Sequence, residues 1–158
     1  RINSNGTLDA SFNPGTGADL FISSLVLQSD GKILICGYFN NYNGFYRKHI
    51  ARVNTNGSLD TSFDPGTGVN AYINSLAIQP DGKILIGGDF TIYNGISRNY
   101  IARVNADGSL DTTFETGNGT NDCIYSIVLQ SDNRIIIGGR FTSYNDTSIN
   151  YIARLWKQ

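Results

Sequence analysis

The chain has 158 residues and a formal net charge of −1, and only 16% of its residues are charged. This composition excludes the concentrated basic surface by which proteins bind nucleic acid or anionic membranes. No apolar run approaches the ~20 residues that a membrane-spanning helix needs. Asn, Ser, Thr, Gly and aromatic residues are frequent while strong helix formers are few, which favours β-structure.

The sequence repeats itself every 51 residues without an insertion or a deletion. The units are 1–51, 52–102 and 103–153, followed by a terminal stub at 154–158. Within each unit the pattern Gly-x-Leu-Asp returns, at 6–9, 57–60 and 108–111. A fixed period of this length indicates one supersecondary block per unit, which buries its apolar surface against its neighbours.

Two tight turns divide each unit into four predicted strands. One turn is Asp30-Gly31 and its equivalents, and the other is Asn56-Gly57 and its equivalents. Such pairs between apolar runs are strong hairpin signals. In the second unit the predicted strands are approximately 71–79, 83–90, 99–105 and 109–114. The equivalents are expected near 20–28, 32–39 and 48–54 in the first unit and near 122–130, 134–141 and 150–156 in the third.

The four strands differ in polarity in a regular order. The first two strands of each unit are almost continuously apolar, whereas the fourth, such as 59–63, is short and polar. This gradient is typical of blades that stack radially around an axis. The prediction is an all-β chain forming a β-propeller segment of three four-stranded blades. Phe39, Phe90 and Phe141 are predicted to be buried between the blades.

Three sequence runs resemble a known family of repeats. They are Leu-Asp-Thr-Ser-Phe-Asp-Pro-Gly-Thr-Gly (59–68), Gln-Pro-Asp-Gly-Lys-Ile-Leu-Ile-Gly-Gly-Asp-Phe (79–90) and Tyr-Asn-Gly-x-x-Arg-Asn-x-Ile-Ala-Arg-Val-Asn (93–105). Over the whole chain the pattern resembles the delta-60 repeat family of bacterial β-propellers, a domain of unknown function. The resemblance implies a propeller blade in each unit. It also implies a place in a large bacterial surface or secreted protein, or in a phage protein.

The number of blades has a consequence for partners. Propellers close with roughly four to eight blades, so three blades are too few for a ring. Two alternatives satisfy this condition. Further propeller repeats of the same parent chain complete the ring, or a homodimer joins two three-blade halves into a six-bladed ring. Residues 7–12 form an orphan fourth strand, and the third blade is expected to be completed by an N-terminal segment of this kind, either from the same chain or from a partner.

The residues able to do chemistry have structural explanations. The single histidine, His49, is equivalent to Tyr100 and Tyr151 and is expected to pack. Without a second histidine neither a Ser/His/Asp arrangement nor a zinc site is predicted. The repeated aspartates, such as Asp60, are expected to cap turns and to pair with the arginine of Ile-Ala-Arg. A paired carboxylate site of the glycosidase type and a calcium loop are the alternatives.

The cysteines Cys36 and Cys123 occupy non-equivalent repeat positions and are predicted to be free thiols. The positions that vary between repeats gather in the loops opposite the Asp-Gly turns. These loops are 13–21, 64–72 and 115–123, with 40–48, 91–99 and 142–150. They carry aromatic and polar residues of the kind that binding surfaces use. The candidate ligand-binding residues on this rim are Phe21, Tyr38, Phe45, Tyr46, Tyr72, Asp89, Ile92 and Arg140.

Two functional hypotheses follow. The first is a non-catalytic module on a cell surface, in a secreted protein or in a virion, which serves as a scaffold or binds protein or glycan ligands without a cofactor or metal. The second is a glycan-active enzyme with its site on the loop rim. The sequence favours the first hypothesis, because every repeated carboxylate has a structural explanation.

Overall fold

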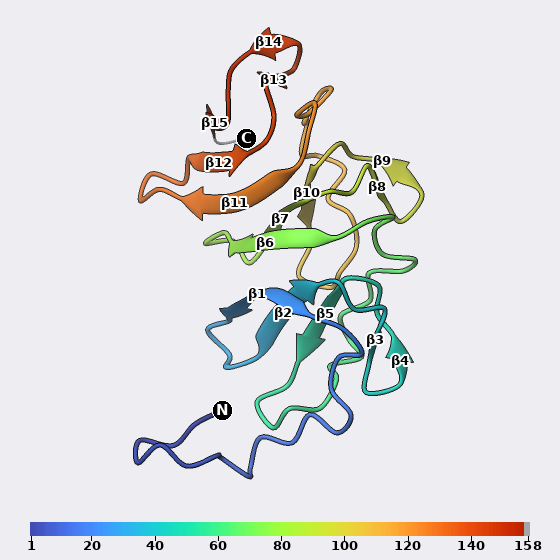
Figure 1. Ribbon diagram of the computed structural model, residues 1–158, viewed down its shortest axis with the longest axis vertical. Coiled ribbons are helices and arrows are strands. Elements are labelled where there is room, and N and C mark those ends of the chain that lie inside the picture. The colour runs from blue at the N-terminus through green and yellow to red at the C-terminus, as the bar shows by residue number, and fades with distance from the viewer. Residues whose placement is uncertain (157–158) are drawn as a thin grey trace.

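The computed structural model describes residues 1–156, and within them it contains β-strands and turns but no helix (Figure 1), hence none that could span a membrane. Three antiparallel sheets of three strands each, one per repeat, form the body of the molecule. The first sheet contains β1 (Ile22–Leu27), β2 (Ile33–Gly37) and β5 (Ile50–Val53). The second contains β6 (Ile73–Ile78), β7 (Ile84–Gly88) and β10 (Ile101–Val104). The third contains β11 (Ile124–Leu129), β12 (Ile135–Gly139) and β15 (Ile152–Leu155). The all-β prediction is confirmed.

The tight turn between the first two strands of each sheet lies where the sequence predicts it. Gly31 and Gly82 adopt φ values of 81° and 84°, and Asn133 takes the same left-handed conformation with φ 64°. Asparagine tolerates this region better than other side chains do. The strands themselves are shorter than predicted, since β7 ends at Gly88 rather than at residue 90.

The prediction of a fourth strand in each unit is wrong, because each sheet has three strands and not four. The segment after β5 makes one isolated bridge, Val53 to Leu59, and its equivalent in the second repeat joins Val104 to Leu110. The chain turns away at the next residue because the Asp60 carboxylate accepts a hydrogen bond from the Ser62 amide at 3.0 Å. The turn therefore limits the pairing to one residue.

Three short hairpins were not predicted and occupy segments expected to be loops. They are β3 (Asn41–Tyr42) with β4 (Phe45–Tyr46), β8 (Ile92–Tyr93) with β9 (Ile96–Ser97), and β13 (Ser143–Tyr144) with β14 (Thr147–Ser148). Asn43 and Gly44 both have positive φ, as a two-residue hairpin turn of the primed type requires. In Figure 1 the β3–β4 and β8–β9 hairpins project on the right, opposite the β1–β2 and β6–β7 turns.

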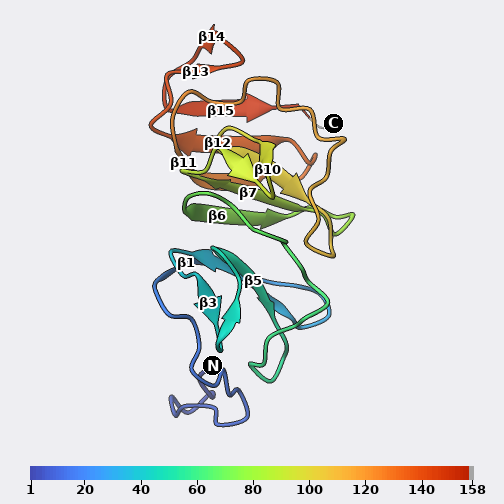
Figure 2. The same ribbon diagram turned by 90° about the vertical axis from the view of Figure 1, so that its right-hand side faces the viewer.

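The sheets stack face to face in an open row along the long axis, with the first residues at one end and β15 near the other (Figures 1 and 2). One core cluster joins the first two sheets and includes Leu34, Ile50, Ile73 and Leu76. A second cluster joins the second and third sheets in the same way. Each of these two junctions therefore buries apolar side chains of two adjacent sheets.

The first strands of adjacent sheets touch through small polar side chains. The Ser23 hydroxyl donates to the Ile73 carbonyl at 2.6 Å, and the Ile127 amide donates to the Ser75 hydroxyl at 3.0 Å. Close approach also explains Gly87, since a Cβ there would lie 2.7 Å from Ile124 Cγ2. The repeated phenylalanine is buried, as predicted, with 0% exposure at Phe39, Phe90 and Phe141. Phe90 and Phe141 belong to the two clusters that join adjacent sheets. Phe39 belongs to a cluster of residues 12–59 that contains none of the second sheet, so its predicted position between blades is wrong.

Candidate functional site

Four ring side chains form a contiguous group between the first and second sheets. Tyr38 and Tyr72 stack with ring centroids 4.0 Å apart and an interplanar angle of 25°. Phe21 meets Tyr38 edge-on at 6.5 Å, and His49 meets Tyr72 edge-on at 5.3 Å. We call Phe21, Tyr38, His49 and Tyr72 the aromatic cluster. Three of its members were predicted as site residues from the sequence.

The backbone explains why these residues meet. Tyr38 follows the last residue of β2, and its amide donates to the Phe21 carbonyl at 2.8 Å, so the two residues are neighbours at the end of one hairpin. Tyr72 is the counterpart of Phe21 in the second repeat and immediately precedes β6. Because β6 packs against the first sheet, its lead-in residue lies beside the end of β2.

His49 is the member of the cluster that the sequence did not assign to a site. It adopts φ 66°, as its counterparts Tyr100 and Tyr151 do with φ 65° and 67°. The side chain is buried, in agreement with the packing role predicted for it, and its Nδ1 has no hydrogen-bond partner in residues 1–156. Burial, followed by the nearby Lys48 charge, lowers the pKa of His49, so the imidazole is neutral at pH 7.

The exposure of the cluster suits contact with a ligand. Phe21 is 76% exposed and Tyr72 is 40% exposed, whereas Tyr38 is half-buried between them. The Tyr38 and Tyr72 hydroxyls donate no hydrogen bond to any residue from 1 to 156. Aromatic rings with free polar tips are suited to ligands that have one apolar and one hydrogen-bonding face.

The other five predicted site residues do not join this cluster. Phe45 and Tyr46 lie on β4, each 53% exposed, and Ile92 lies on β8, 40% exposed. On the second repeat the Asp89 carboxylate accepts a hydrogen bond from the Asn74 amide at 3.3 Å. On the third repeat Arg140 pairs with Asp122 at 3.2 Å, and the two side chains are 65% and 38% exposed.

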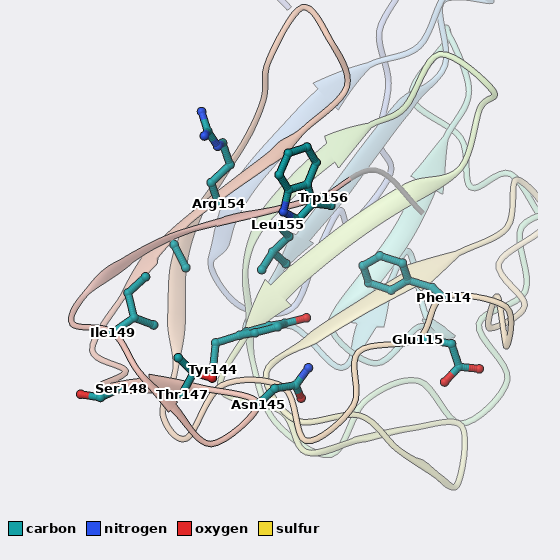
Figure 3. A pocket seen from close by; sticks show the side chains of 11 residues that line it. Phe114, Glu115, Tyr144, Asn145, Thr147, Ser148, Ile149, Arg154, Leu155 and Trp156 are labelled. Atoms are coloured by element: carbon teal, nitrogen blue, oxygen red, sulfur yellow. The ribbon is translucent and has the colours of Figure 1, made fainter.

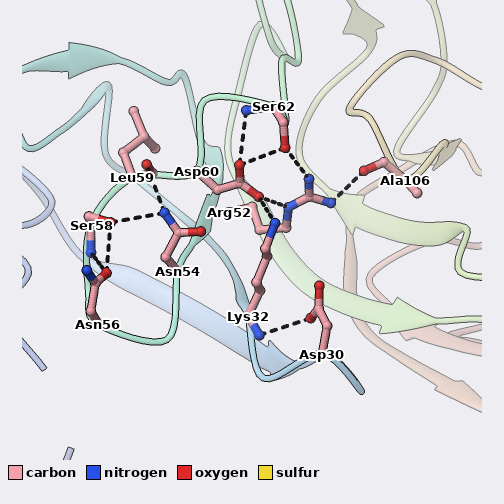
Figure 4. A network of polar contacts seen from close by, with 10 residues as sticks. All are labelled: Asp30, Lys32, Arg52, Asn54, Asn56, Ser58, Leu59, Asp60, Ser62 and Ala106. Atoms are coloured by element: carbon pink, nitrogen blue, oxygen red, sulfur yellow. Dashed lines mark hydrogen bonds and ion pairs between the residues drawn. The ribbon is translucent and has the colours of Figure 1, made fainter.

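The repeated carboxylates are held in ion pairs, as the sequence predicts. Asp60 Oδ2 lies 2.7 Å from Arg52 Nε and 2.8 Å from Lys32 Nζ (Figure 4). Its Oδ1 accepts hydrogen bonds from the amide and the hydroxyl of Ser62. Burial raises the pKa of Asp60, but the hydrogen bonds from Lys32, Ser62 and Arg52 outweigh that effect and keep it well below its usual range.

The second repeat contains the same arrangement. Asp111 lies 2.6 Å from Arg103 Nε and 2.8 Å from Lys83 Nζ. The Arg103 guanidinium also lies 4.7 Å from the centroid of the Phe114 ring. These contacts tie the segment after each third strand to the sheet, which gives the carboxylates a structural role.

Cysteine and metal-ligand residues are the remaining reactive groups. Cys36 and Cys123 are free and buried, as predicted, and burial raises the pKa of Cys36 to about 12. Within residues 1–156 no three His, Cys, Asp or Glu side chains are grouped so that they could hold a metal ion.

A cavity of about 500 Å³ lies on the third repeat, between β15 and the β13–β14 hairpin. Figure 3 shows Phe114, Tyr144, Leu155 and Trp156 around it. Its lining also includes the charged residues Glu115 and Arg154, which lie at opposite ends of the cavity in Figure 3. The cavity lies at the end of the row of sheets, away from the aromatic cluster between the first two.

Comparison with known proteins gives one family. The model of a family described as a domain of unknown function (DUF5122) beta-propeller matches residues 28–63, 79–114 and 130–157, more than half of the chain, and the three matches begin 51 residues apart. A search of curated proteins finds no match. The resemblance to a β-propeller repeat family is thus confirmed at the level of the fold.

Proposed function

The chain belongs to this family of β-propellers, and we propose that it is a non-catalytic module that binds a protein or glycan ligand through the aromatic cluster. The observation that carries the proposal is the stack of Tyr38 on Tyr72, flanked by the exposed ring of Phe21. A ligand with a flat apolar face, such as a sugar ring or an aromatic side chain, fits this surface.

The repeat comparison supports a binding role for the cluster. Its positions are occupied by different residues at the second junction, where Asp89, Tyr100 and Cys123 replace Tyr38, His49 and Tyr72. The glycine turns and the Arg–Asp pairs, by contrast, recur in each complete junction. Loops on a rigid scaffold vary without disturbing the fold, and this freedom is what ligand-binding surfaces use.

The proposal also covers the setting of the module. We place it on a bacterial cell surface, in a secreted protein or in a virion. The support is the resemblance to delta-60 repeats and a composition rich in Asn, Ser, Thr and Gly. A glycan-active enzyme is the competing reading, and Asp89 is the rim carboxylate that such a site would use.

A glycan array, followed by titration of any hit, tests the binding surface. Tyr72→Ala is expected to raise the dissociation constant about threefold to tenfold, because an aromatic contact contributes ~0.5–1.5 kcal/mol beyond its buried area. Tyr46→Ala is the matched control, since Tyr46 is an exposed tyrosine on the β3–β4 hairpin outside the cluster.

Three results would count against the proposal. Binding that survives Tyr72→Ala but is lost in Tyr46→Ala would move the site to the hairpin. Absence of binding to any glycan and to any protein of an extracellular panel would remove the binding role. Release of a hydrolysis product that Asp89→Asn abolishes would favour the enzyme.

A further inference from the structure

The cavity on the third repeat has two filled counterparts in the same chain. In the first repeat the residues equivalent to Phe114, Tyr144, Ala153 and Leu155 belong to one cluster around Leu59, whose exposure is only 9%. These equivalents are Phe12, Tyr42, Ala51 and Val53. No counterpart of Leu59 packs against Tyr144 among residues 1–156. The cavity therefore has the lining of a leucine site.

The tyrosine hydroxyl indicates a second feature of a segment that would fit this cavity. Tyr42 donates to the Gly57 carbonyl at 2.8 Å, and Tyr93 donates to the Gly108 carbonyl at 2.6 Å. Each acceptor is the glycine of the turn that precedes Leu-Asp. Tyr144 stands at the same place but donates to no residue within 1–156. An occupant with the same turn would supply the acceptor.

The charges at the cavity identify a third feature. In the first two repeats two basic residues hold one carboxylate, as Arg52 and Lys32 hold Asp60. The corresponding basic residues of the third repeat are Arg154 and Arg134. Arg154 makes no ion pair with any residue from 1 to 156. The Arg134 guanidinium pairs with Asp132 at 3.4 Å and lies 4.4 Å from the centroid of the Trp156 ring. These two cations form a site for one carboxylate.

The first residues of the chain contain the leucine, the turn glycine and the carboxylate that would fit this cavity. Residues 6–9 read Gly-Thr-Leu-Asp, and Leu8 bridges Ile2 as Leu59 bridges Val53. Asp9 pairs with Arg1 as Asp60 pairs with Arg52. The segment thus has the conformation of its two buried counterparts. Leu8, however, is 78% exposed.

We propose that residues 6–9 of a second copy of this chain occupy the cavity of the third repeat. Leu8 of the second copy packs against Tyr144 and Leu155, and the Gly6 carbonyl accepts the hydrogen bond from the Tyr144 hydroxyl. Asp9 lies between Arg134 and Arg154. Arg1 and Ile2 of the incoming segment withdraw, because Arg154 and Leu155 already occupy the equivalent places.

The end faces of the row of sheets support the same partner. Within the chain, Val26 of the first sheet packs against the cluster that contains Leu76 of the second. The counterpart of Val26 on the third sheet is Val128, 55% exposed, and the counterpart of Leu76 on the first sheet is Leu25, 62% exposed. A second copy that continues the row brings these two faces together as Val26 and Leu76 already meet. Two copies contribute six sheets, a number at which propellers close.

Light scattering on the 158-residue chain across a range of concentrations tests the pairing. We expect a dimer, and Leu8→Asp is expected to raise its dissociation constant at least tenfold. Because Leu8 is exposed, this substitution is expected to leave the circular dichroism spectrum unchanged. Ile96→Asp is the matched control, since Ile96 is 43% exposed on β9 and lies outside both end faces. It is expected to dimerise as the unaltered chain does.

A charge exchange tests the geometry of the contact. Arg154→Glu places a carboxylate opposite Asp9 and is expected to weaken the dimer at least tenfold. Combining it with Asp9→Arg restores the opposite charges across the contact and is expected to recover most of the loss. A chain that stays monomeric at all concentrations would overturn the proposal. So would a dimer that neither Leu8→Asp nor Arg154→Glu weakens.

Discussion

Replacing Asp111 with asparagine removes one charge from a buried network and keeps the size of the side chain. The Asp111 side chain is 4% exposed, and that of its partner Arg103 is 6% exposed. Asparagine can still accept the hydrogen bond that Oδ1 receives from the Thr113 amide at 3.0 Å. It cannot balance the charges of Arg103 and Lys83, whose nitrogens lie 2.6 and 2.8 Å from Oδ2.

The size of the effect follows from the burial of the partners. Removing one partner of a buried pair lowers the free energy of unfolding by ~3–5 kcal/mol. Lys83 is 32% exposed, so solvent screens its share. We therefore expect Asp111→Asn to lower the free energy of unfolding by about 3 kcal/mol, the lower end of that range.

Urea unfolding followed by circular dichroism measures this difference. Asp9→Asn is the matched control, because Asp9 makes the equivalent pair with the half-exposed Arg1 at the surface. At concentrations too low for the proposed pairing of two copies, where Asp9 contacts only its own chain, this substitution is expected to leave the unfolding midpoint unchanged. A loss below about 1 kcal/mol for Asp111→Asn, or an equal shift for Asp9→Asn, would refute the assignment of the stability to burial of the pair.

The same network sets the response to acid. The pKa of Asp111 is lowered because hydrogen bonds from Lys83, Thr113 and Arg103 outweigh the opposing effect of burial, which is the largest single contribution. A depressed folded-state pKa stabilises the fold above the unfolded value of ~3.9, and this stability is lost as the pH falls from there towards the folded-state pKa. The free energy of unfolding of Asp111→Asn is expected to fall less between pH 5 and pH 2 than that of the unaltered chain. The difference is the contribution that the ionised Asp111 carboxylate makes to the pH dependence. Parallel pH profiles for the two chains would contradict this.

Two further substitutions test the packing between sheets by the same urea assay. Phe90→Ala is expected to lower the free energy of unfolding by ~3–5 kcal/mol because the ring is 0% exposed in the central core cluster, and a loss below ~1 kcal/mol would contradict that burial. Tyr93→Phe is expected to cost about 1 kcal/mol, the hydrogen bond to Gly108, whereas Tyr144→Phe is expected to cost nothing in the monomer because its hydroxyl has no acceptor in residues 1–156. Equal losses for these two tyrosines would contradict the assignment of the effect to that bond.

The sequence predicts the sheets well because their signals recur in every repeat. The Asp-Gly turn, the apolar run after it and the Ile-Ala-Arg strand locate β1, β2 and β5 and their equivalents. The short hairpins were not predicted because a strand of two residues shows no periodicity, although Asn43-Gly44 is itself a hairpin signal. The fourth strand was predicted wrongly because the sequence around Leu59 resembles the start of a strand. The hydrogen bond from the Ser62 amide to the Asp60 carboxylate turns the chain away after one paired residue.

The aromatic cluster shows where prediction from sequence reaches its limit. The loop rim was identified because its residues vary between repeats, but eight residues were nominated and three of them meet. Tyr38 and Tyr72 are far apart in sequence and stack only because β6 packs on the first sheet. His49 was assigned to packing through its tyrosine counterparts, and its φ of 66° directs it to the same junction.

The two junctions between sheets share the features that hold the sheets together and differ in a few residues at the loop end. Both junctions bury a phenylalanine, hold an aspartate between two cations and cross-link their first strands through a small polar side chain. The two junctions differ in a few side chains at the loop end. Tyr38 and Tyr72 stack in the first junction, and Asp89 and Cys123 occupy the equivalent positions in the second. A repeat that keeps its turns and ion pairs can therefore exchange these residues without disturbing the sheets. This is the physical reason why the fold can be predicted from the repeated residues, whereas the side chains at the loop end of each junction cannot be predicted from the repeat.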